Sequence, residues 1–154
     1  IFNGFELRAA VTPYTGGGYM HATDDRTPVT FITRYYLDKI KRLCDAHGTK
    51  LLFVTAPSPV NHTMQRHNEV QALADALAVP YLDLNLNTEE LGIDWNLDTL
   101  DGGDHLNYTG CQKATAYLQR YMQTHYTLPD RRDDVRYEAW NKQAEEFEKL
   151  LPQP

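Results

Sequence analysis

Residues 51–59 read Leu-Leu-Phe-Val-Thr-Ala-Pro-Ser-Pro, and they give the strongest signal for the class of fold. Four apolar residues followed by a β-branched threonine are typical of a short parallel strand that is buried on both faces. Pro57 has no backbone N–H to donate to a strand ladder, so the strand should end by residue 56. The stretch therefore predicts a parallel sheet in an α/β domain.

Helical patterns stand on both sides of this strand. Apolar residues recur at helical spacing in four segments, and residues 81–84 have the pattern of a second short strand. The helices are expected at 30–47, 67–78 and 108–125, with a last one beyond residue 134. Asn107 has the side chain of an N-cap for the third helix. This alternation predicts helical crossovers between parallel strands.

Two strands bury too little apolar surface for a complete doubly wound domain, so the pattern is typical of its C-terminal half. The α/β core portion is expected at residues 30–128. Residues 1–29, which contain two prolines and the glycines 16–18, should form an irregular connecting segment with one short strand at 5–11. Residues 129–154 should form a hinge and a C-terminal helix.

The composition excludes several classes of protein. Hydrophobic residues make up 42% and charged residues 23% of the 154, which is ordinary for a folded globular chain. With 15 basic and 21 acidic residues the net charge is −6, which excludes a general nucleic-acid binder with a basic surface. No apolar run in the sequence approaches the length of a membrane span. Because the chain begins with Ile1, we expect it to be a processed or trimmed product with a segment upstream.

Cys44 and Cys111 are expected to be buried free thiols. Both fall at apolar positions of predicted helices, and their spacing matches no zinc motif. Two cysteines do not decide between an oxidising and a reducing compartment.

The stretch with the most chemistry is 94–110, Asp-Trp-Asn-Leu-Asp-Thr-Leu-Asp-Gly-Gly-Asp-His-Leu-Asn-Tyr-Thr-Gly. It lies between a strand and a helix, at the sheet edge where active sites of open α/β folds collect. A carboxylate near His105 can fix the tautomer of the imidazole and stabilise its protonated form, as a general base for a hydroxyl nucleophile requires. Two glycines after Asp101 allow a tight loop back to the ring. Alternatively, His105 only starts the helix and the aspartates form a solvated loop.

Two metal-binding patterns are incomplete. Residues 94–98 carry Asp, Asn and Asp at the spacing that opens a calcium loop, but Thr99 and His105 replace its Gly and Glu. His62 and His67 are five residues apart and would not share a helix face, which disfavours a zinc pair. We therefore expect no metal and no cofactor.

The stretch around His105 resembles the last block of the SGNH (GDSL-like) hydrolase and acyltransferase superfamily. It has an aspartate, a short gap, His105-Leu-Asn and then a glycine that opens the next helix. The sequence is most similar to bacterial extracytoplasmic members related to teichoic-acid D-alanylation and polysaccharide O-acetylation proteins. The resemblance covers about residues 30–142. It implies a flavodoxin-like three-layer domain in which His105 is the catalytic base and a preceding aspartate orients it.

Two departures from the superfamily pattern affect the site. The aspartate usually stands three residues before the histidine, where this chain has Gly102, so Asp101 is the first candidate for the acid and Asp104 the second. The nucleophile, glycine and asparagine blocks of the superfamily lie on earlier strands, and none is found in this sequence. The chain would therefore hold the base and the acid without the nucleophile or the oxyanion hole.

Ser58 is the only serine of the chain. The prolines on both sides of it do not suit a nucleophile elbow, so we expect Ser58 to lie at the rim of the substrate pocket, with attack by its hydroxyl as the unorthodox alternative. Asn61 and Asn107 are the other expected substrate-binding residues.

The resemblance implies the C-terminal part of a serine esterase or acyltransferase that acts on acyl groups, acetyl among them, of cell-envelope glycans or on small esters. It also implies an extracytoplasmic location in a bacterium, with any membrane anchor upstream. The alternative is a non-catalytic SGNH-like module that binds glycan or a membrane acyltransferase. Since half a sheet leaves apolar edges uncovered, we expect an upstream segment or a second copy of the chain as partner, and no nucleic acid.

Overall fold

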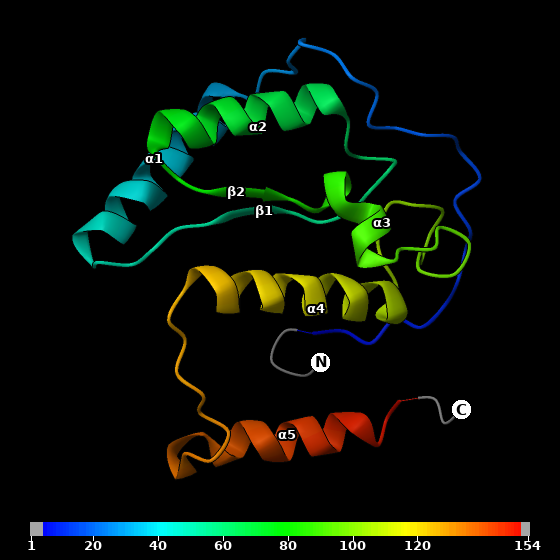
Figure 1. The fold of residues 1–154 in the computed structure, drawn as a ribbon, viewed down its shortest axis with the longest axis vertical. Helices are drawn as coiled ribbons and strands as arrows, with labels where there is room; N and C mark the ends of the chain where they lie inside the picture. Colours follow the sequence, from blue (N-terminus) through cyan, green and yellow to red (C-terminus); the bar gives the residue numbers. More distant parts are fainter. Residues whose placement is uncertain (1–4, 152–154) are drawn as a thin grey trace. The chain divides into compact units, whose positions relative to one another are not determined.

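The computed structural model describes residues 5–151, and a two-stranded parallel sheet lies within this part of the chain (Figure 1). Strand β1 (Phe53–Thr55) pairs with strand β2 (Tyr81–Asp83). Helix α2 (Met64–Leu77) connects them and runs along the sheet in the same view. The predicted strand–helix–strand crossover and the mixed α/β class are confirmed.

Threonine caps begin the first two helices. The Thr30 hydroxyl accepts a hydrogen bond from the first turn of α1 (Phe31–Ala46) at 3.1 Å, and the Thr63 hydroxyl accepts one from the first turn of α2 at 3.4 Å. Because of the Thr63 cap, α2 starts three residues before the predicted residue 67. Of the three added residues only Met64 is apolar, and a single apolar residue does not show a helical periodicity.

Between β2 and the next predicted helix, the structure contains two short helices, η1 (Leu84–Asn87) and α3 (Thr88–Leu91). An irregular stretch then leads to α4 (Tyr108–His125), which has its predicted bounds. The side-chain oxygen of Asn107 accepts a hydrogen bond from Gly110 N at 3.1 Å, so Asn107 is the predicted N-cap.

The short strand expected at 5–11 is not formed, since only Phe5 makes a bridge there. The following residues pair instead with the loop before α4. The backbone N–H groups of Thr12 and Tyr14 donate to the carbonyl oxygens of Thr99 and Trp95, at 3.1 and 2.9 Å. The proline between the two donors cannot continue a regular ladder, which limits this pairing to isolated bonds.

The chain divides into two compact units, and the larger one comprises residues 9–115. The other contains residues 116–151 and, at the N-terminal side, the described residues 5–8. It includes η2 (Val135–Tyr137) and α5 (Glu138–Glu148). The predicted domain limits at residues 29 and 128 stay predictions.

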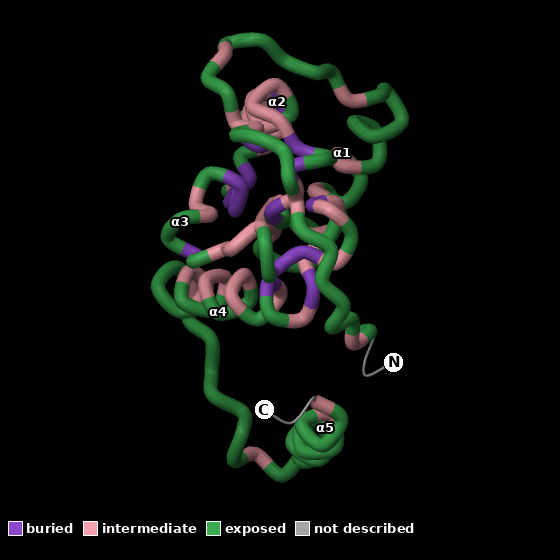
Figure 2. Tube along the Cα trace, turned by 90° about the vertical axis from the view of Figure 1, so that its right-hand side faces the viewer, coloured by how far each residue is buried: buried purple, intermediate pink, exposed green. Residues whose placement is uncertain are grey.

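The buried residues of the larger unit gather in α2, around β2 and in the loop before α4 (Figure 2). The apolar ones are Leu73, Ala74, Val79, Leu82, Leu84 and Leu91, and the polar ones are His62, Glu69, Asp83, Asn85, Asp98, Thr99 and Asn107. Among the described residues, every buried side-chain nitrogen or oxygen has a hydrogen-bond partner. This core therefore depends on a polar network as much as on apolar packing.

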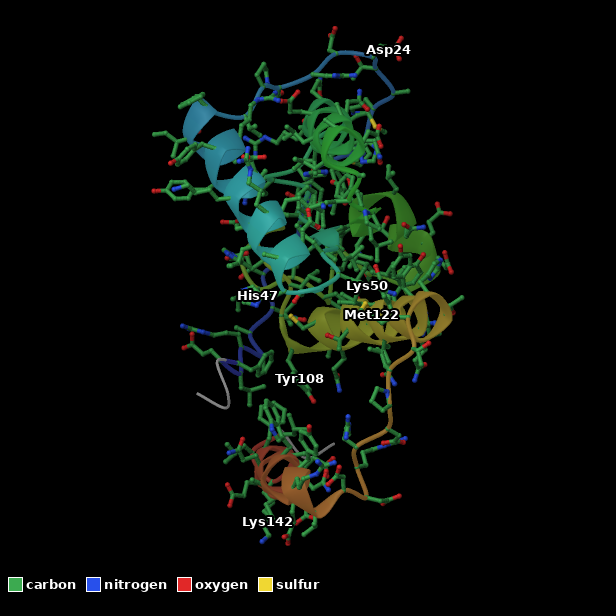
Figure 3. All side chains as sticks on the ribbon, turned by 90° about the vertical axis from the view of Figure 1, so that its left-hand side faces the viewer. Asp24, His47, Lys50, Tyr108, Met122 and Lys142 are labelled. Atoms are coloured by element: carbon green, nitrogen blue, oxygen red, sulfur yellow. The ribbon has the colours of Figure 1, made fainter. Side chains whose placement is uncertain are left out.

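Helix α1 contributes no buried residue, although all of its residues are described. Its exposed apolar side chains are Phe31, Ile32, Tyr35, Tyr36, Ile40 and Leu43. Figure 3 shows side chains projecting from the outer side of this helix. An ion pair between Arg34 and the buried Glu69 connects α1 to α2. The large exposed apolar face is a surface that another chain segment could cover.

Both cysteines are free thiols, as predicted, but neither is buried. Cys44 and Cys111 are each partly exposed, because the faces of α1 and α4 that carry them are only partly covered. Partial burial still raises the pKa of the Cys111 thiol. None of the helices in residues 5–151 has both the length and the apolar character needed to cross a bilayer.

Candidate functional site

Asp101 contacts His105 at two points. One carboxylate oxygen accepts a hydrogen bond from the His105 backbone N–H at 2.7 Å, and the other lies 2.7 Å from Nδ1 of the ring. Gly102 and Gly103, with φ of 76° and 99°, form the left-handed turn that brings the carboxylate back to the ring. The His105 side chain is 68% exposed, so its Nε2 edge is accessible from solvent.

The charges of this pair stabilise each other. The hydrogen bond that the Asp101 carboxylate accepts from the ring, followed by the charge of Asp104, raises the pKa of His105 above its ordinary 6.5. Two hydrogen bonds from His105 lower the pKa of Asp101, and the one from its backbone N–H has a larger effect than the one from its ring. Asp101 is therefore an ionised partner that favours one tautomer and the protonated form of the imidazole.

Asp104 lies farther from the ring, at 3.7 Å from Nδ1, and adds charge without a hydrogen bond. Its carboxylate instead accepts a hydrogen bond from the side-chain amide of Asn61. Of the two candidate acids, Asp101 is thus the one that contacts His105. Asn61, predicted to bind substrate, lies exposed beside this loop.

Ser58 connects the end of β1 to the same loop. Its hydroxyl donates to the carbonyl oxygen of Asp104 at 2.8 Å, with Gly103 O at 3.2 Å, and accepts a hydrogen bond from Asn61 N at 3.3 Å. These bonds direct the Ser58 hydroxyl to the backbone. The arrangement fits the rim position expected for Ser58 better than the alternative in which its hydroxyl attacks a substrate.

Gly103 is required where the loop approaches the rest of the unit. A Cβ atom at this position would lie 2.8 Å from the Pro59 ring and 2.9 Å from the Tyr14 ring. The loop that carries Asp101 and His105 is therefore in close contact with the end of β1 and with the N-terminal segment.

Asn107 is buried and its side chain has structural partners. Besides capping α4, its amide donates to the carbonyl oxygens of Leu97 at 2.7 Å and Ala10 at 3.3 Å. Asn107, a predicted substrate-binding residue, thus has a buried side chain whose hydrogen bonds hold the backbone of the loop before α4.

The side chains of the incomplete calcium pattern form hydrogen bonds within the protein. Asp94 accepts hydrogen bonds from the backbone and side chain of Asn96, and Asp98 accepts them from Asp94 N and the Lys113 ammonium group. Although burial opposes ionisation, the Lys113 and backbone hydrogen bonds lower the pKa of Asp98. The charge of the Asp98 carboxylate is therefore balanced by Lys113. Its hydrogen bonds hold the loop, and the carboxylate is not free to bind calcium.

A second histidine–carboxylate cluster lies at the end of β2. His62 Nε2 and His67 Nδ1 each lie 2.8 Å from the same oxygen of Asp83. As their spacing predicts, the two histidines do not share a helix face, because His62 precedes the Thr63 cap and only His67 is on the helix. They come together nonetheless, because both contact Asp83. Asp83 lies near the end of a predicted strand, and a crossover helix begins at the same carboxyl edge of a parallel sheet. These two sequence signals could have placed both histidines near it.

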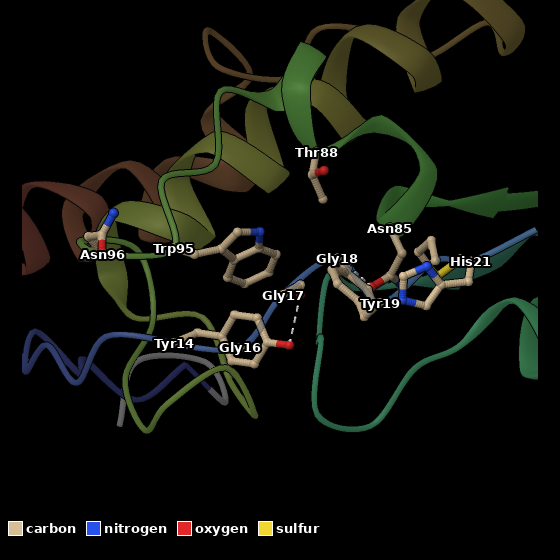
Figure 4. A pocket seen from close by; sticks show the side chains of 11 residues that line it. Tyr14, Gly16, Gly17, Gly18, Tyr19, His21, Asn85, Thr88, Trp95 and Asn96 are labelled. Carbon is tan, nitrogen blue, oxygen red and sulfur yellow. Dashed lines mark hydrogen bonds between the residues drawn. The ribbon is translucent and has the colours of Figure 1, made fainter.

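A pocket of about 570 Å³ lies beside the Asp101–His105 loop, with Tyr14 as a shared wall. The ring of Trp95 packs edge-on against Tyr14, at 6.1 Å between centroids, and against Tyr19, at 6.0 Å. In Figure 4, Tyr14 and Trp95 lie on one side of the pocket, and Asn85 and His21 on the other. Aromatic faces beside amide groups provide the surfaces that bind sugar rings.

A scan against protein-family models found no match, and neither did searches of curated proteins and of solved structures.

Proposed function

We propose that this chain supplies the histidine and aspartate of a serine esterase or acyltransferase of the SGNH type. The observation that carries the proposal is the two-point contact between Asp101 and His105. A base needs a fixed ring, an ionised partner on Nδ1 and an accessible Nε2. The parallel strands and the α2 crossover are compatible with the C-terminal half of a flavodoxin-like domain.

In this proposal, Nε2 of His105 accepts the proton of a serine hydroxyl while the serine oxygen attacks the acyl carbonyl. Asp101 stabilises the imidazolium that forms. His105 then gives the proton to the leaving alcohol oxygen as the ester bond breaks, which leaves the acyl group on the serine. Water or an acceptor hydroxyl removes the acyl group by the same proton transfers in reverse.

The nucleophilic serine is proposed to come from a segment other than residues 5–151. Ser58 is the only serine in the sequence, and its hydroxyl donates to a backbone carbonyl. A hydroxyl that supports the loop does not have His105 as its acceptor in this arrangement. The SGNH resemblance likewise assigns the nucleophile to an earlier strand.

The proposed substrates are acylated glycans of a bacterial cell envelope, with acetyl as the first acyl group to test. The aromatic pocket supports this class of substrate, because Trp95 and Tyr14 offer rings for stacking and Thr88 offers a hydroxyl group. Its wall at Tyr14 also touches the loop that carries His105. A sugar held in this pocket would therefore lie near the proposed base.

The test is fluorophosphonate labelling of the native protein that contains this chain, with the adduct mapped by peptide mass spectrometry. We expect an adduct on a serine other than Ser58, and hydrolysis of p-nitrophenyl acetate and of an O-acetylated polysaccharide. His105→Ala should lower turnover by about a thousandfold or more, since loss of the base removes the proton acceptor. His47→Ala, which changes an exposed histidine at the end of α1, is the control.

Each outcome decides something. Unchanged turnover in the His105→Ala variant would overturn its assignment as base. An adduct on Ser58 would show that the chain carries its own nucleophile. Absence of any adduct, together with glycan binding that depends on Trp95, would favour the alternative of a non-catalytic binding module.

A further inference from the structure

The cluster of His62, His67 and Asp83 has no part in the proposed reaction. Its three potential ligand atoms, Nε2, Nδ1 and one carboxylate oxygen, lie within 4.8 Å of one another. His62 and Asp83 are buried, and the His67 side chain is 15% exposed. The ligands come from the loop before α2, the first turns of α2 and the end of β2.

Both histidine nitrogens point at one carboxylate oxygen instead of sharing the two oxygens. The second oxygen of Asp83 accepts hydrogen bonds from the backbone N–H of Asn85, at 3.0 Å, and from its side-chain amide, at 2.8 Å. The Asn85 bonds thus fix the carboxylate and leave one oxygen to both imidazoles. Metal-binding carboxylates in proteins are commonly held by such outer hydrogen bonds.

The charge state of the cluster also suits a cation. Burial opposes ionisation, but hydrogen bonds from His62 and Asn85 hold the pKa of Asp83 well below its usual range, so the carboxylate is anionic. Two imidazoles and one carboxylate are a common ligand set for zinc and related metals. The ring of His67 stacks on Tyr81, with 5.4 Å between centroids, which limits its rotation.

We propose that His62, His67 and Asp83 bind one divalent transition-metal ion, with Zn²⁺ as the first candidate. The ion would lie between the two ring nitrogens and the Asp83 oxygen, and each neutral imidazole would then carry its hydrogen on its other nitrogen. The ion would connect Asp83 at the end of β2 to His62 before α2 and to His67 in its first turn. A water molecule would be the fourth ligand of a tetrahedral site. The inference is independent of the proposed esterase function, because it uses none of the same residues.

The experiment is a calorimetric titration of the full chain, without a histidine tag, with ZnCl₂, and a parallel titration with CoCl₂ followed by visible absorption. We expect one equivalent of Zn²⁺, a higher Tm with the metal, and the d–d bands of four-coordinate Co²⁺. His67→Ala removes the most accessible ligand and should weaken binding at least about tenfold. Asp83→Asn keeps the shape of the side chain and should remove the intense Co²⁺ bands.

The control is His105→Ala, because Asp101, Asp104 and His105 are the other group of ligand atoms close enough to hold a metal among the described residues. This variant should bind Zn²⁺ like the original chain. If it loses binding while His67→Ala keeps it, the metal belongs to the His105 loop and the proposal is wrong. The proposal is also overturned if the unaltered chain takes up no Zn²⁺ at micromolar concentrations, which would leave a buried hydrogen-bond network only.

Discussion

For a single residue, the pKa of His105 is the property that links the structure to chemistry. The two-point contact with Asp101 is short in sequence, four residues, and needs the two glycines between them for its geometry. Because the side chain is largely exposed, the contact orients the ring and tunes its protonation, and it adds little to stability.

We expect Asp101→Asn to lower the pKa of His105. The raised pKa keeps the ring protonated above pH 6.5, so the neutral base appears only at higher pH. Replacing the Asp101 carboxylate weakens the charge-assisted hydrogen bond that is the main cause of this rise. An NMR titration of the histidine ring protons in the full chain measures the change, and in the active protein the acid limb of kcat/KM should move to lower pH. Asp94→Asn, whose carboxylate contacts Asn96, is the control, and an unchanged His105 pKa in Asp101→Asn would contradict the assignment.

For a secondary-structure element, the end of α2 contains a strained residue. Ala78 caps the helix in the left-handed region, with φ 51°, and is exposed. An L-residue with a Cβ atom pays a steric cost there that glycine avoids. The cap is nonetheless formed, because Val79 behind it is buried and its N–H donates to Ala74 O at 2.9 Å.

Ala78→Gly should therefore stabilise the chain by about 0.5–1 kcal/mol. The matched control is Ala76→Gly, an exposed position inside α2, where glycine should destabilise by a similar amount, about 0.5–1 kcal/mol. Urea denaturation followed by circular dichroism measures both changes. Equal destabilisation by the two substitutions would mean that residue 78 is helical in solution.

For the whole molecule, the main unexplained surface is the apolar face of α1. A helix with six exposed large apolar side chains and no buried residue resembles a helix that normally packs against another element. Its connection to the rest of the larger unit includes the ion pair between Arg34 and Glu69 of α2. We expect a second copy of the chain or a further segment of the protein to cover this face.

In light scattering, the isolated chain should therefore have about twice its 17.7 kDa mass. Replacing Ile32 and Tyr36 by lysine should give the monomer mass, because charges on the apolar face prevent its burial. Replacing Leu97 and Leu128, which are exposed outside α1, by lysine should leave the mass unchanged. A monomer of the unaltered chain without a bound peptide would contradict the expectation.

Patterns of neighbouring residues predicted most of the secondary structure, whereas most contacts between distant segments were not predicted. The bounds of α4, its Asn107 cap and the β1–α2–β2 crossover follow from apolar spacing and from side chains that act on neighbouring backbone. The choice of Asp101 over Asp104 as the partner of His105 was also local, because a glycine pair can reverse the chain over four residues.

The apolar periodicity predicted neither the start of α2 at Met64 nor the failure of residues 5–11 to form a strand. The Thr63 cap adds three residues of which only Met64 is apolar, and the N-terminal segment bonds to a loop about 80 residues away in sequence. Periodicity carries no information on such pairings, since it describes only the face that an element presents.

The amino-acid sequence by itself determined the α/β class, the position of the two strands and the acidic loop around His105, because each depends on neighbouring residues. Only the tertiary structure decided that His62 and His67 meet on Asp83 and that Tyr14 and Trp95 border one pocket. These groups come from segments far apart in the chain, and the crossover and the loop contacts bring them together. Their proximity is a property of packing, which no local pattern encodes.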